Sequence, residues 1–76
     1  MQHHSRADVQ QLRNAVSELA HELAEALTAA TAYLEAGQQL ENRSDPARLH
    51  DAVSKAIEQT KRAGEVVAKL RSIASP

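Results

Sequence analysis

His21 is followed directly by Glu22, and the two residues stand in the middle of a long helical sequence pattern. An imidazole with an unprotonated ring nitrogen is a nucleophile, and a carboxylate that accepts the other ring N–H fixes which nitrogen carries the proton. His21 is therefore a candidate nucleophile and Glu22 its candidate orienting base. Glu25 lies one helical turn after His21, but two ligands from one helix are too few to hold a metal ion, so no metal site is predicted.

A predicted helix over residues 6–41 carries this pair. Ser5 and Asp8 form a capping box variant that starts the helix, and no proline interrupts it. When Val16 is labelled a and Leu19 d of a heptad, His21 falls at f, opposite the packing seam, and should face solvent. The seam residues recur three and four positions apart: Val9, Leu12, Val16, Leu19, Leu23, Ala26, Ala30 and Tyr33.

A second helix is predicted over residues 46–74, after a loop over 42–45. Asp45 is a good N-cap, and Pro46 suits the first helical position, where a missing N–H costs nothing. Gly64 lies inside this helix, which suggests a close helix crossing there, whereas Lys61 and Arg62 are expected on a solvated face. Its apolar stripe is Leu49, Val53, Ile57, Thr60, Gly64, Val67, Leu70 and Ala74.

The predicted fold class is all-α, an antiparallel two-helix hairpin formed across the short loop. Ala20, Leu27 and Leu34 make the apolar stripe of the first helix wider than one seam. A lone hairpin would leave this flank in water, so we expect a homodimer that closes a four-helix bundle.

Composition restricts the class of protein further. The 76 residues make one small domain over 1–76, with 9 basic and 10 acidic residues, a net charge of −1 and no cysteine. Intermixed charge predicts no binding to nucleic acid or to an anionic membrane, and Tyr33, the single aromatic residue, offers no stacking platform. No apolar run approaches a membrane span, and the polar start does not read as a signal peptide, so a cytoplasmic protein is expected. The His3-His4 pair is assigned no function.

Several segments of the chain resemble the dimerisation and histidine-phosphotransfer domain of sensor histidine kinases, especially the FixL-like oxygen-sensor group. In the first helix the matching segments are residues 19–23 (LAHEL), 27–29 (LTA) and 33–36 (YLEA). In the second they are residues 56–60 (AIEQT), 62–67 (RAGEVV) and 69–71 (KLR). The resemblance covers residues 16–73, nearly the whole predicted hairpin.

This resemblance implies that His21 is a phospho-acceptor and Glu22 the adjacent acid, in a two-component signalling pathway. It implies two partners, a histidine kinase ATP-binding domain and a response-regulator receiver domain. Family members usually carry a polar or basic residue three positions after the histidine, Thr, Asn or Gln four after and Pro five after, whereas Ala24, Glu25 and Ala26 stand here. Alanine at 26 should leave the helix without the usual bend, and Glu25 argues against phosphatase activity.

The chain is not expected to be a kinase on its own. Gly37 and Gly64 are its only glycines, so no phosphate-binding loop, nucleotide site or other cofactor is predicted. Phosphotransfer through His21 is the first hypothesis. The alternative is a degenerate, non-catalytic module that dimerises or binds a kinase or response regulator, and a helical oligomerisation domain outside signalling is a third.

Overall fold

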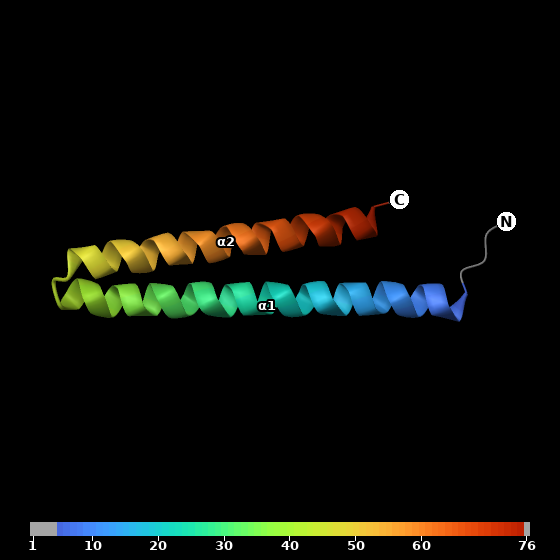
Figure 1. Ribbon diagram of the computed structural model, residues 1–76, viewed down its shortest axis with the longest axis horizontal. Coiled ribbons are helices and arrows are strands. Elements are labelled where there is room, and N and C mark those ends of the chain that lie inside the picture. Colours follow the sequence, from blue (N-terminus) through green and yellow to red (C-terminus); the bar gives the residue numbers. More distant parts are fainter. Residues whose placement is uncertain (1–4, 76) are drawn as a thin grey trace.

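The computed structural model describes residues 5–75, which form two antiparallel helices joined by a tight turn (Figure 1). Helix α1 spans Arg6–Asn42 and helix α2 spans Pro46–Ala74. No strand occurs in this part of the chain, and the predicted all-helical fold is confirmed. The His3-His4 pair and Pro76 lie outside the described residues.

Local capping determines where both helices begin. The Ser5 hydroxyl accepts a hydrogen bond from the Asp8 N–H at 3.1 Å, and the Ser5 N–H donates to the Asp8 carboxylate at 3.3 Å. Asp45 accepts from the Arg48 N–H at 3.2 Å at the start of α2. These contacts satisfy N–H groups that have no partner inside the helix, so both starts agree with the predicted ones.

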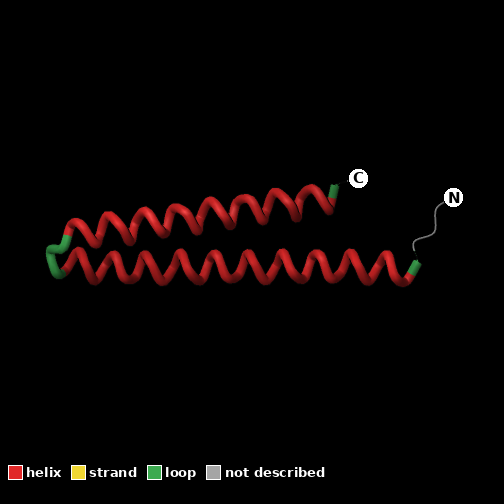
Figure 2. Tube along the Cα trace, viewed as in Figure 1, coloured by secondary structure: helices red, strands yellow, loops and turns green. Residues whose placement is uncertain are grey.

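The turn between the helices is made by three residues, Arg43, Ser44 and Asp45 (Figure 2). Ser44 has a φ of 55°, the left-handed conformation that often ends a helix. The Asp45 N–H donates to the Leu40 carbonyl at 3.1 Å, which closes the end of α1. The chain thus reverses within a few residues, and α2 returns along α1.

The core between the helices is built from small side chains. Five of the six buried apolar residues in the described chain are alanines; the six are Ala26, Ala30, Ala52, Ala56, Ala63 and Val66. Small residues allow two helices to approach closely, and the hairpin measures only 64 × 17 × 11 Å. Helix α1 is continuous through Ala26, which is fully buried.

The two glycines differ in their surroundings. A Cβ on Gly37 would lie 3.5 Å from Leu49 Cδ1 and 3.9 Å from Ala52 Cβ, so Gly37 is the glycine at the contact between the helices. A Cβ on Gly64 would meet nothing within 4 Å, and Gly64 is exposed. The expected close crossing at Gly64 is therefore wrong within the hairpin, because this residue lies on the face of α2 that turns away from α1.

Large apolar side chains gather outside the core. Nine of them are 38–54% exposed in the described chain: Val9, Leu12, Val16, Leu27, Leu34, Val53, Ile57, Val67 and Ile73. On α1, Leu27 and Leu34 lie about a quarter turn from the buried seam, and Val53 and Val67 have a similar offset on α2. Because the helices run antiparallel, the two offsets bring these stripes to the same side of the hairpin, which we call the apolar face.

Candidate functional site

His21 lies on the solvent side of α1, where its heptad position predicted it. Its side chain is 76% exposed, in a continuous helical segment without strain in the backbone. Most of the imidazole ring is thus accessible to a reagent from solvent.

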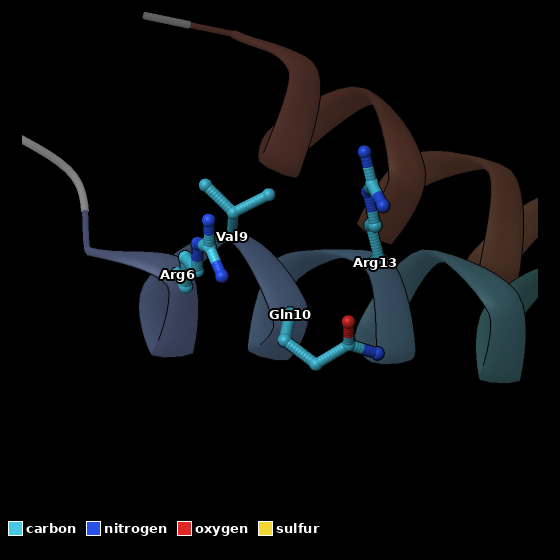
Figure 3. A pocket seen from close by; sticks show the side chains of 4 residues that line it. All are labelled: Arg6, Val9, Gln10 and Arg13. Atoms are coloured by element: carbon cyan, nitrogen blue, oxygen red, sulfur yellow. The ribbon is translucent and has the colours of Figure 1, made fainter.

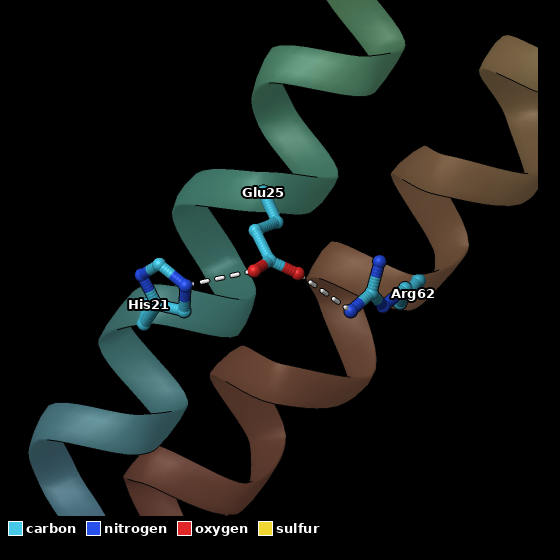
Figure 4. A network of polar contacts seen from close by, with 3 residues as sticks. All are labelled: His21, Glu25 and Arg62. Atoms are coloured by element: carbon cyan, nitrogen blue, oxygen red, sulfur yellow. Dashed lines mark ion pairs between the residues drawn. The ribbon is translucent and has the colours of Figure 1, made fainter.

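The carboxylate that contacts His21 is that of Glu25. His21 Nε2 lies 2.8 Å from Glu25 Oε1 (Figure 4). Side chains four residues apart are neighbours on a helix surface, whereas consecutive residues point about 100° apart. Glu22 is half-buried toward the seam, and no hydrogen bond or ion pair joins Glu22 to His21 in the described chain.

Glu25 also connects the two helices. Its second oxygen, Oε2, lies 3.5 Å from a terminal nitrogen of Arg62, which comes from α2 (Figure 4). The three side chains form a row across the hairpin in which one carboxylate lies between an imidazole and a guanidinium. We call this row the His21–Glu25–Arg62 network.

The sequence predicts Arg62 on a solvated face, whereas the structure places it half-buried against α1. The same side of the hairpin carries Lys55, whose Nζ lies 5.8 Å from the centre of the Tyr33 ring and 3.3 Å from Asp51 Oδ2. This polar face, defined by Glu25, Arg62 and Lys55, lies on the opposite side of the hairpin from the apolar face.

No cluster of three or more metal-ligating side chains occurs within residues 5–75. The same residues contain no helix that combines the length and apolar character needed to cross a membrane. A shallow hollow near the start of α1 is lined by Arg6, Val9, Gln10 and Arg13 (Figure 3). It involves one helix only and lies two turns or more before His21, so it adds nothing to the network.

No protein-family model matches the chain, and no solved structure matches it. The resemblance to histidine-phosphotransfer domains therefore depends on the residues of the two helices themselves. Their arrangement places an exposed imidazole against a carboxylate of the same helix, and that carboxylate against a guanidinium from the second helix.

Proposed function

We propose that this chain is a phosphotransfer module of two-component signalling, in which His21 accepts a phosphoryl group and passes it on. The observation that carries the proposal is the exposed imidazole, which a carboxylate holds at 2.8 Å. Phosphoryl transfer requires little covalent machinery from the acceptor beyond an oriented nucleophile that the donor can approach in line. The donor would be a separate histidine kinase ATP-binding domain or a phosphorylated receiver, and the acceptor a receiver-domain aspartate.

We further propose that two copies pair through the apolar face into a four-helix bundle. The hairpin leaves large side chains such as Leu34 (54% exposed) and Ile57 (51% exposed) in water, whereas five of the six buried apolar residues of the described chain are alanines. Full burial of a leucine side chain stabilises by about 1.5–3 kcal/mol, so a second copy over this face would gain stability from apolar surface that the hairpin alone leaves in water. His21 and Arg62 would stay accessible, because they lie away from that face.

The decisive experiment is intact mass spectrometry of the purified chain after incubation with a histidine kinase or a phosphorylated receiver. The expected result is the gain of one phosphoryl group, which is lost in acid, as expected for a phosphoramidate bond. His21→Ala should abolish the gain. His50→Ala is the matched control, because His50 is also exposed on a helix, and it should retain the label. Failure of every such donor to label the folded wild-type chain would refute the proposal.

The second candidate is a non-catalytic module that binds a kinase or receiver without phosphoryl transfer. The contact between Glu25 and Nε2 favours it, because relatives carry Thr, Asn or Gln at this position and a carboxylate there occupies a ring nitrogen. In this case His21→Ala should leave partner binding unchanged in a pull-down with the kinase or receiver. Loss of binding in His21→Ala, but not in His50→Ala, would count against it.

A further inference from the structure

The His21–Glu25–Arg62 network distinguishes the two ring nitrogens of His21. Glu25 can accept a hydrogen bond only from a nitrogen that carries a proton, and the nitrogen it contacts is Nε2. Figure 4 shows Nδ1 on the side of the ring away from Glu25. In the neutral ring, a proton on Nε2 leaves the lone pair on Nδ1.

We propose that Glu25 holds the proton of His21 on Nε2 and thereby makes Nδ1 the nucleophilic nitrogen. The part of this inference that concerns phosphoryl transfer rests on the proposed function. Glu25 acts here as a positioning residue, the role that the motif assigned to Glu22.

In the transfer step, the donor is an acyl phosphate. The Nδ1 lone pair attacks phosphorus and forms the N–P bond, while the P–O bond breaks and its electron pair leaves on the carboxylate. The proton stays on Nε2, so the ring becomes a cation beside the Glu25 carboxylate. Attack through Nε2 would instead require the phosphoryl group to displace Glu25, and two anionic groups would then share one position.

Arg62 supports this arrangement from α2. Its guanidinium lies 3.5 Å from Glu25 Oε2, so the other carboxylate oxygen, Oε1, is left for the imidazole. Arg62 also offsets the charge of Glu25 when an anionic phosphoryl group approaches the ring. It acts through Glu25 and touches no atom of His21 in the pairs described, which makes it a second positioning residue.

The first test measures the tautomer of each imidazole by 15N NMR of the labelled chain, at a pH where the rings are neutral. We expect the ratio of Nε2–H to Nδ1–H to be about two- to fivefold higher at His21 than at His50, the range that an exposed charged contact supports. Glu25→Ala should bring the His21 ratio to that of His50, and Glu22→Ala should leave it high. Equal ratios in the wild type, or a response to Glu22→Ala alone, would overturn the proposal.

Arg62 is tested by the same spectra. Arg62→Ala should lower the His21 ratio part of the way, and Arg62→Lys should restore it, because a lysine keeps the cation. Lys61→Ala is the matched control and should change nothing. A ratio that Arg62→Ala leaves unchanged would remove Arg62 from the positioning role.

The second test uses phosphoramidate, a small donor whose P–N bond breaks as ammonia leaves, so that no protein partner is needed. The proportion of Nδ1-phosphohistidine, measured by NMR, should be higher at His21 than at His50 and should fall to the His50 value in Glu25→Ala. Predominant labelling of His21 at Nε2 would overturn the inference while leaving the proposed function intact. Conversely, a chain that shows the tautomer preference but is labelled by no kinase or receiver would refute the proposed function. The inference about Glu25 and the ring proton would then still hold.

Discussion

On an α-helix a side chain meets neighbours three and four positions away, and this spacing decides which acid contacts His21. Glu25 meets the ring at 2.8 Å, while Glu22 turns toward the seam. The carboxylate at position 25 places a negative charge beside the His21 imidazole and links that side chain to α2 through Arg62.

Ser44 provides a prediction at the scale of a single residue. Its φ of 55° is unfavourable for a residue with a Cβ, and glycine adopts it without this cost. We expect Ser44→Gly to raise the free energy of unfolding by about 0.5–1 kcal/mol, measured by urea denaturation. Arg43→Gly is the control: Arg43 has a right-handed conformation with φ −92°, so glycine there should destabilise. Equal effects of the two glycines would contradict this account of the turn.

At the scale of the element, each helix is defined by contacts that lie close together in the sequence. The Ser5–Asp8 box and the Asp45 cap involve residues three apart, which is why both starts could be predicted from the sequence, and the end of α1 to within one residue. Exposure of His21 followed from its heptad position in the same way. The contact with Glu25 can also be predicted from the sequence, because side chains four residues apart are neighbours on a helix surface, whereas adjacency in the sequence favours Glu22.

The cap of α2 gives a prediction for this helix. Asp45→Ala removes the hydrogen bond from the Arg48 N–H, as well as a contact of 3.6 Å with the Arg48 side chain. Loss of such a cap costs about 1 kcal/mol, so the thermal midpoint should fall by several degrees for a domain of this size. Asp51→Ala is the matched control, because it removes only the exposed pair with Lys55 and should shift the midpoint little. Similar losses in both variants would show that the cap is not what starts α2.

At the scale of the whole molecule, the register between the helices decides which side chains meet. Glu25 lies 17 residues before Asn42, and Arg62 lies 16 residues after Pro46, so the two are nearly equidistant from the turn. Residues equidistant from the turn of an antiparallel hairpin face each other, and this rule could have predicted the pair once the turn was placed. The charge pattern of one helix alone could not have predicted this pair, because the contact depends on both helices and on the rotation of each about its axis.

The apolar face should control the association of two copies of the chain. Leu34→Lys adds a charge at its most exposed leucine, and a two-fold dimer would carry this change twice. The dissociation constant, measured by sedimentation equilibrium, should rise on the order of 100-fold, because burial of two leucines is lost. Gln39→Lys adds the same charge on α1 at an exposed position outside that face and should leave the constant unchanged. A wild-type chain that sediments as a monomer at micromolar concentration would contradict the dimer itself. Equal weakening by both lysines would show instead that association depends on net charge rather than on this face.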